Sequence, residues 1–326
     1  MKTRAIIHGL AAAALLAGSV STAMAADEID VRFSWKLKGE YGLFYYGQSE
    51  GFYEDNDITL NLGEGAGSQA ALGALVQGQE DVVVMPAIFA ISAIQRGMPV
   101  KIAALYQPAA AIALISHPDN PVLEPKDLEG KSIAHSVGET GTSYLGVFCA
   151  ANNIDCDSIN KVQMDSGSRV PQFIQRQVDA VSVYMTNDLP VLEARLDTEF
   201  PTLVLADHGL AVPGMAAVVS NDGIAENSDA LKRFLAATAK SIEATRADPI
   251  AATEALKSVW QAGPDNEVVL AQIEATSDSI PEASEHPVGW IDERLIAKSL
   301  EMLQTQDDLG ELRPLGEFYT NELLSE

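Results

Sequence analysis

The chain of 326 residues is poor in cysteine, histidine and basic side chains. Its two cysteines are too few for a structural zinc site, and no histidine pair lies at ligand spacing beside them. Against 21 lysines and arginines stand 46 acids, which give a formal charge of −25. Nucleic acids and anionic membranes attract basic surfaces, so we expect neither as a partner. The acidity is interpreted as a solubilising surface.

Long apolar runs are missing after the first 25 residues. Lys2 and Arg4 precede the apolar stretch 5–20, and an Ala-x-Ala cleavage pattern ends at Ala25. A membrane-spanning helix needs about 20 apolar residues, so we interpret residues 1–25 as a cleavable signal peptide and not as an anchor. No cysteine lies beside the cleavage site. We therefore expect a periplasmic protein without a lipid anchor.

Catalytic patterns are also scarce. The sequence has no G-x-S-x-G elbow, and the glycine loop 63–68 lacks both a Walker lysine and the G-x-G-x-x-G ending. His135 is followed by Ser136, but adjacent side chains rarely form a nucleophile and its base. We expect no enzymatic activity and no cofactor.

Cys149 and Cys156 lie close together in the sequence. In an oxidising compartment two such cysteines often pair, and the alternative is two reduced thiols with one of them buried. We favour a disulfide, which would join the end of a helix to the loop 152–155.

Strand and helix patterns alternate through most of the chain. Strands are expected at 29–35, 58–62, 81–85, 100–106, 109–115, 131–135, 161–164, 180–184, 202–205 and 215–220. Helices are expected between them at 41–53, 69–77, 87–96, 141–151, 169–177 and 187–195. Four further helices are expected at the C-terminus, at 228–246, 249–261, 266–279 and 292–304.

This order predicts an α/β protein with mostly parallel sheets covered by helices. The proline-rich break 118–125 separates two blocks of similar layout, which favours two lobes over one continuous sheet. We expect lobe 1 to comprise residues 26–112 and 213–326, and the inserted lobe 2 to comprise residues 113–212. Two extended crossings would join the lobes, and the C-terminal helices would return to lobe 1.

Four polar loops follow strands and lead into helices in this scheme. Ligands of open α/β sheets bind at the carboxyl ends of strands, where free N–H groups at helix starts attract anions and carbonyl oxygens. For any single loop, capping of the helix is a sufficient explanation. Convergence of all four on one cleft favours ligand binding. The loops are 63–68, 136–143, 165–169 and 184–188.

Trp35 ends the first expected strand, and an aromatic run follows it as far as Gly51-Phe52-Tyr53. Segment 179–190 places an aromatic residue and then Asn-Asp after a strand, and Val288-Gly289-Trp290 lies near the C-terminus. These segments resemble periplasmic solute-binding proteins of the NMT1/THI5-like family. The resemblance implies a type II periplasmic binding protein, with two doubly wound α/β lobes, a two-strand hinge and a C-terminal helical tail. It also implies an ABC permease of the inner membrane as partner.

The thiamine-precursor branch of that family binds an aminopyrimidine. The resemblance implies that Trp35 and Tyr184 stack on the ring and that Asp188 accepts hydrogen bonds from its amino groups. Asp188 departs from the glutamate usual in that branch, so a flavin, an aromatic carboxylate and an alkyl sulfonate stay open as ligands. Arg169 would suit a carboxylate or a sulfonate.

The alternative class is an exported enzyme acting on a pyrimidine-like substrate, which the absence of the cysteine-rich motif of related pyrimidine-synthesising enzymes disfavours. We expect a monomer that binds a small-molecule ligand. The candidate ligand-binding residues are Trp35, Tyr41, Glu64, Ser68, Pro86, Tyr106, Glu139, Thr140, Thr142, Arg169, Tyr184, Asn187 and Asp188.

Overall fold

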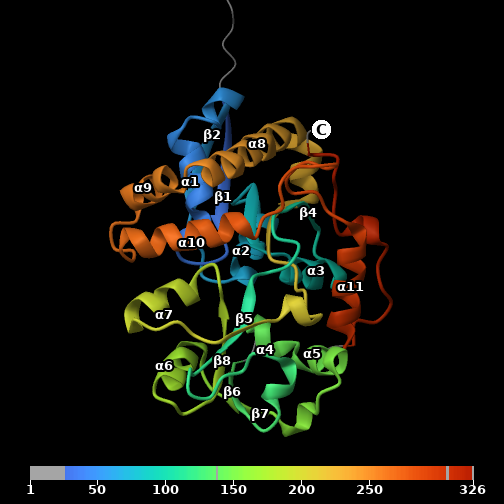
Figure 1. The fold of residues 1–326 in the computed structure, drawn as a ribbon. Helices are drawn as coiled ribbons and strands as arrows, with labels where there is room; N and C mark the ends of the chain where they lie inside the picture. The colour runs from blue at the N-terminus through green and yellow to red at the C-terminus, as the bar shows by residue number, and fades with distance from the viewer. Residues whose placement is uncertain (1–25, 137–138, 306–307, 325–326) are drawn as a thin grey trace, which may run out of the picture.

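Two sheets, one above the other in Figure 1, organise the chain. The computed structural model describes residues 26–136, 139–305 and 308–324, and these residues form two five-stranded sheets. The expected signal peptide, residues 1–25, lies outside the described residues. Within the described ranges, no helix combines the length and the apolar character needed to cross a membrane.

The first sheet has the strand order β2-β1-β3-β10-β4. β1 runs parallel to β2 and β3, whereas β10 is antiparallel to both β3 and β4. Alternation in β1 buries Ile29, Val31 and Phe33. The strands are β1 (Asp27–Phe33), β2 (Ile58–Gly63), β3 (Val82–Pro86), β4 (Val100–Leu105) and β10 (Met215–Ser220).

The second sheet repeats this arrangement, with the order β7-β6-β8-β5-β9. Here β6 is parallel to β7 and β8, and β5 is the antiparallel strand between β8 and β9. Each sheet therefore holds one reversed strand next to its edge. The strands are β5 (Ile112–Ser116), β6 (Ser132–His135), β7 (Asn160–Gln163), β8 (Ala180–Tyr184) and β9 (Thr202–Val204).

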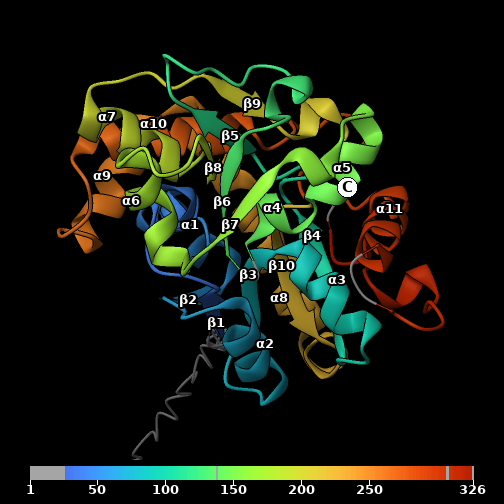
Figure 2. The same ribbon diagram turned by 90° about the horizontal axis from the view of Figure 1, so that it is seen from below.

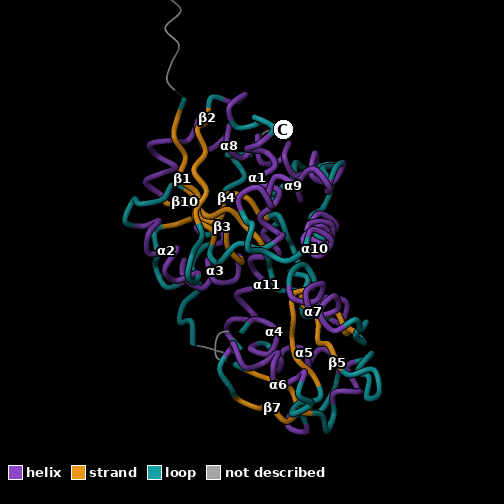
Figure 3. The backbone as a smooth tube through the Cα atoms, turned by 90° about the vertical axis from the view of Figure 1, so that its left-hand side faces the viewer, coloured by secondary structure: helices purple, strands orange, loops and turns teal. Residues whose placement is uncertain are grey.

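Helices pack on both sheets (Figures 1 and 2). The first sheet and its helices form what we call the first unit. These helices are α1 (Gly42–Ser49), α2 (Ser68–Val76), α3 (Ala87–Gln95), α8 (Asn221–Ala247), α9 (Pro249–Val259), α10 (Asn266–Asp278) and α11 (Glu293–Gln304). The second sheet and its helices form the second unit. These helices are α4 (Thr140–Ser143), α5 (Leu145–Asn152), α6 (Arg169–Ile174) and α7 (Asp188–Leu196). The C-terminal helices thus belong to the first unit, as Figure 3 shows from the side.

Three expected elements have different limits in the structure. The helix expected over 41–53 ends at Ser49, because the backbone turns through a positive φ at Gly51. The helix expected over 141–151 is divided into α4 and α5 at Tyr144. The first of the C-terminal helices, α8, begins at Asn221 and continues across a kink at Asn227, whereas the sequence predicts a start only at 228.

Two crossing segments, 106–111 and 205–214, connect the units. They bond to each other, because Ala110 N donates to Val212 O at 2.6 Å and Gly214 N donates to Gln107 O at 2.8 Å. Gln107 also accepts from Met215 N through its side-chain oxygen at 3.0 Å. The crossings therefore form one joint, and the strand expected to begin at 109 begins only at Ile112.

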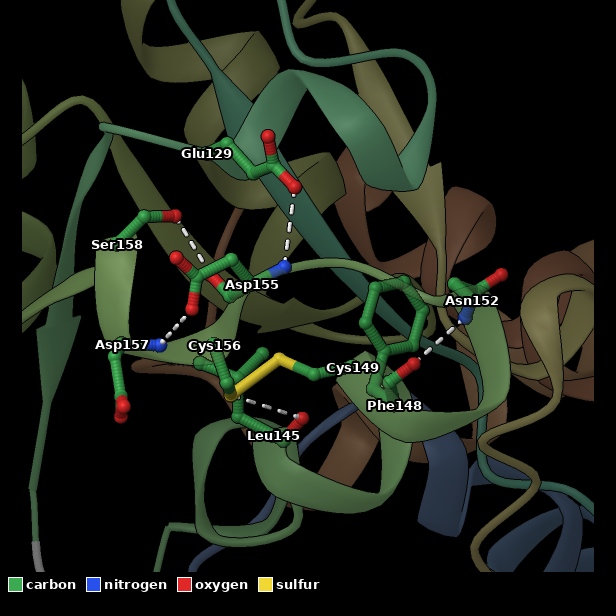
Figure 4. The surroundings of a disulfide bond; sticks show 9 residues. All are labelled: Glu129, Leu145, Phe148, Cys149, Asn152, Asp155, Cys156, Asp157 and Ser158. Atoms are coloured by element: carbon green, nitrogen blue, oxygen red, sulfur yellow. Dashed lines mark hydrogen bonds between the residues drawn. A yellow bond between two sulfur atoms is a disulfide. The ribbon is translucent and has the colours of Figure 1, made fainter.

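A disulfide joins Cys149, in the last turn of α5, to Cys156 (Figure 4). Their Cα atoms are 5.5 Å apart, and Cys156 begins a short turn that the Asp155 side chain caps by accepting from Asp157 N. Glu129 accepts from Asp155 N at 3.1 Å, so the cross-linked loop is also held to the segment before β6.

Removing the disulfide should lower stability. The bridge closes a loop of sequence separation 7, and constraining so short a loop in the unfolded chain contributes roughly 2 kcal/mol. Urea unfolding of the double variant Cys149→Ser/Cys156→Ser should show this loss in the free energy of unfolding. Reduced wild-type protein should unfold like the variant, and equal stability of the oxidised and reduced wild type would contradict the expectation.

Candidate functional site

A cavity of about 930 Å³ lies between the two sheets. Its walls come from the carboxyl ends of parallel strands in both units, including Ser34 after β1, Met85 in β3 and Ser136 after β6. The crossings close it at the back through Gln107 and Gly214. The topology alone explains this position, since the parallel strands of each sheet end on the side that faces the other unit.

All four polar loops predicted from the sequence contribute to the lining. The structure brings together ten of the candidate residues in the described lining, from both units: Trp35, Tyr41, Ser68, Pro86, Glu139, Thr140, Arg169, Tyr184, Asn187 and Asp188.

Glu64, Tyr106 and Thr142 lie outside the described lining. The Glu64 carboxylate accepts from Leu37 N at 2.7 Å and braces the loop after β1 from outside. Tyr106 is buried in the core of the first unit, where its ring contacts Phe44. Thr142 is buried behind the cavity wall and donates to Glu139.

Trp35 extends into the cleft from a short segment held by the glycine loop. Gly65 N donates to Trp35 O at 3.1 Å, and a Cβ at Gly65 would lie 2.0 Å from the Phe33 oxygen. Only glycine allows this approach, which explains the glycine loop without any phosphate. The Trp35 side chain is 56% exposed, so its ring surface is open to a ligand.

The other two aromatic candidates in the described lining, Tyr41 and Tyr184, already have partners. The ring of Tyr41 stacks on Phe33 with centroids 4.0 Å apart, and burial raises the pKa of its hydroxyl. Tyr184 places its hydroxyl 3.1 Å from Thr140 Oγ1, and burial raises its pKa also. Tyr41 and Tyr184 therefore form parts of the cavity wall, whereas the ring of Trp35 is exposed and free to stack on a ligand.

Lys38 and Glu40 line the cavity too, and the sequence analysis did not select them. Their charged groups are 2.5 Å apart, and Lys38 Nζ lies 5.3 Å from the Tyr41 ring centre and 5.7 Å from that of Tyr184. Burial alone would lower the pKa of the Lys38 ammonium, but the Glu40 carboxylate and the Tyr41 and Tyr184 hydroxyls together outweigh it, and the pKa lies above its usual value. Both residues lie between the candidates Trp35 and Tyr41 in the sequence, and this position could have identified them as further candidates for the binding site.

Glu139 is the N-cap of α4. Its carboxylate accepts from Gly141 N at 2.6 Å and from Thr142 N at 2.8 Å, and the hydroxyls of Thr142 and Ser182 also donate to it. Both of its oxygens are engaged in this way. Glu139 therefore shapes the wall of the second unit and holds its loop in place.

Arg169 lies 3.8 Å from the Glu139 carboxylate and donates from Nη1 to both Ser182 oxygens at 3.1 Å. Its Nε is buried and has no hydrogen-bond partner in the described part of the chain, and the same holds for Ser136 Oγ and Asn187 Oδ1. All three residues line the cavity. A buried polar atom without a hydrogen-bond partner costs free energy, and a hydrogen bond to a ligand or to water would recover it.

Asn187 and Asp188 begin α7 at the edge of the cavity. One Asp188 oxygen accepts from Tyr184 N at 3.0 Å, which holds the carboxylate close to the end of β8. Asn187 Nδ2 donates to Glu40 Oε2 at 2.6 Å. Among the described residues, no group of three His, Cys, Asp or Glu side chains is placed to hold a metal ion.

His135 lies behind the cavity wall of the second unit, and its Nδ1 is 2.7 Å from Thr142 Oγ1. Burial holds the pKa of its imidazole below the usual value; Lys161 and Arg169 act in the same direction, and Glu139 opposes them. The folded state therefore prefers neutral His135.

This preference predicts a pH-dependent stability. The contribution of neutral His135 is fully present above the unfolded pKa of about 6.5 and is lost as the pH falls through the lower folded pKa. Urea unfolding between about pH 7 and about pH 5 should show a smaller loss of stability in His135→Asn than in the wild type. A comparison at about pH 8, above the titration, measures the separate cost of the altered hydrogen bond. Parallel pH profiles would contradict the assignment.

Solved structures of similar fold come from several bacteria. The aliphatic sulphonate-binding protein SsuA of Escherichia coli has a TM-score of 0.66 at 18% identity and covers 86% of each chain. The alkanesulfonate-binding SsuA of Xanthomonas axonopodis pv. citri, bound to MOPS, has a TM-score of 0.62 at 16% identity, over 93% of this chain and 99% of that one. The nitrate-binding NrtA of Synechocystis PCC 6803 has a TM-score of 0.66 at 12% identity, over 91% and 87%.

These similarities confirm the expected fold class, two α/β units of the periplasmic binding protein type with C-terminal helices. No curated protein sequence matches. The family model described as NMT1/THI5 like matches residues 39–252, which include most of the described cavity lining, while Ser34, Trp35 and Lys38 precede the match. The chain belongs to the NMT1/THI5-like family.

Proposed function

We propose that this protein is the periplasmic solute-binding component of an ABC importer, which captures a small molecule and delivers it to an inner-membrane permease. The cavity carries the proposal, because it lies between two units joined by a bonded pair of crossings, and three of its lining residues have a buried polar atom without a partner in the described part of the chain. A site between two such units traps its ligand when they close. The sulphonate- and nitrate-binding proteins of similar fold support this class of function.

We assign lobe 1 to residues 26–112 and 213–326 and lobe 2 to residues 113–212. This division follows the crossings, which the chain enters after β4 and leaves before β10. Two lobes and one cleft suffice for capture, so the protein is proposed to act as a monomer and without catalysis.

A thiamine-type pyrimidine is the first candidate ligand. Trp35 offers an open ring for stacking, and Asp188 lies at the same cavity. The Glu40 carboxylate can only accept, so it holds the Asn187 amide with nitrogen toward itself and leaves Oδ1 for a donor. A ring with exocyclic amino groups supplies such donors.

An organic anion is the second candidate. Arg169 Nε and Ser136 Oγ are donors that lack a partner in the described part of the chain, and both residues lie on the wall of the second unit. A sulfonate or carboxylate oxygen would satisfy them. The volume of about 930 Å³ lies within the range of small-molecule sites and leaves room for an alkyl sulfonate, an aromatic carboxylate or a flavin.

A thermal-shift panel should separate these ligands. We expect stabilisation by one class among an aminopyrimidine, riboflavin, benzoate and an alkanesulfonate, since a ligand at 100 times its Kd adds about 2.7 kcal/mol to stability. A shift that grows with ligand concentration identifies the class. Absence of any shift across the panel would count against solute binding.

Variants of the cavity should then weaken binding of the identified ligand without unfolding the protein. Trp35→Ala and Asp188→Ala should each raise the Kd about tenfold, which corresponds to about 1.4 kcal/mol of lost stacking or hydrogen bonding. Trp290→Ala is the matched control, because Trp290 is also partly exposed and lies outside the described lining. Calorimetric titration measures the Kd, and unchanged affinity in both variants would refute the site.

For an anionic ligand, Arg169→Met should cause the largest loss of affinity. Arg176→Met is its control, since Arg176 belongs to the same unit but pairs with Asp119 at the surface. A ligand that binds equally well to Arg169→Met and to the wild type would exclude the anion assignment.

A further inference from the structure

Three almost fully buried polar residues meet where the two units touch beside the cleft. Asn187, Glu40 and Gln272 are 6%, 8% and 3% exposed. Asn187 belongs to the second unit, Glu40 lies in the turn Gly39–Tyr41 of the first, and Gln272 lies in α10. Figures 1 and 3 show α10 directly against α7, whose N-cap is Asn187.

Two hydrogen bonds cross from unit to unit at this point. Asn187 Nδ2 donates to Glu40 Oε2 at 2.6 Å, and Gln272 Nε2 donates to Asn187 O at 2.8 Å. One residue of the second unit is thus held by its side chain and by its main chain. Neither bond can persist when the units move apart.

Contacts within the first unit hold Gln272 and Glu40 in position for these two bonds. Gln272 Oε1 accepts from Gly39 N at 3.0 Å, so each end of the Gln272 amide has a defined partner. A Cβ at Gly39 would lie 2.2 Å from Gln272 Cβ, so only glycine lets the turn pack on α10. Glu40 uses its other oxygen to pair with Lys38 at 2.5 Å.

We propose that Glu40, Gln272 and Asn187 form an inter-lobe latch that holds the cleft closed and positions Asn187 at the cavity. Gln272 lies outside the described lining, so it acts through Asn187 and not on the ligand. When the cleft opens, water replaces both cross-unit bonds, and closing regains them in a site that excludes water. The latch rests on the proposed function only in assuming that the cleft opens to admit a solute.

The test needs no ligand, so its outcome is independent of the thermal-shift panel. Single-molecule energy transfer between dyes at introduced Leu123→Cys and Ile250→Cys, both exposed positions in different units, reports the ratio of closed to open protein. Gln272→Glu retains an acceptor for Gly39 N and loses the donor to Asn187 O. We expect the closed-to-open ratio to fall about tenfold, the typical effect of one such bond.

Gln48→Glu is the matched control, because Gln48 Nε2 donates to Leu60 O at 2.7 Å within the first unit. It should leave the ratio unchanged. Gln272→Met tests the same bond without adding a charge, and Asn187→Ala removes the Glu40 bond while leaving the main-chain bond to Gln272. Thermal unfolding checks that each variant is folded.

The proposal predicts that all three latch variants open the cleft and that the control does not. The same energy-transfer distribution in the wild type and in the folded latch variants would overturn it. A ligand-free wild type that is found mainly open would overturn it as well.

Discussion

The hydrogen bonds between the two crossing segments set the geometry on which everything else depends. The chain leaves the first sheet after β4 and returns in β10, and the crossings are joined through Gln107, Ala110, Val212 and Gly214. A single crossing would leave the two units free to turn about one another. Two crossings bonded side by side keep the carboxyl ends of both sets of parallel strands opposite each other, and the cavity exists because of this opposition.

The cleft contains several charges in a largely buried setting, and four of them form two ion pairs, each within one unit. Lys38 pairs with Glu40 in the first unit, and Arg169 lies beside Glu139 in the second. Burying an unpaired charge costs several kcal/mol, and in both pairs the compensating charge comes from the same unit and not from across the cleft. Arg169 Nε, Ser136 Oγ and Asn187 Oδ1 remain without a hydrogen-bond partner in the described part of the chain.

Glutamine and asparagine side chains perform the tasks that need both a donor and an acceptor. Gln107 links the crossings and Gln272 links α10 to the second unit, while the Asn187 side chain donates to Glu40 of the first unit. An amide can bridge two main-chain groups without the desolvation cost of an ion. This explains how α10, a C-terminal helix of the first unit, is bonded to Asn187 of the second unit.

The sequence by itself determined the alternation of strands and helices and the loops that converge on the cleft, because apolar periodicity and turn residues are local properties. Glu64 and Tyr106 were selected for the same local reasons, yet Glu64 supports the loop after β1 from outside and Tyr106 is buried in the core of the first unit. Only the tertiary structure decided which side of each loop faces the cavity. The contact of Gln272 with Asn187 joins residues 85 positions apart, and no periodicity records such a pairing. It arises from the angle between the two units, which the packing of the whole chain determines.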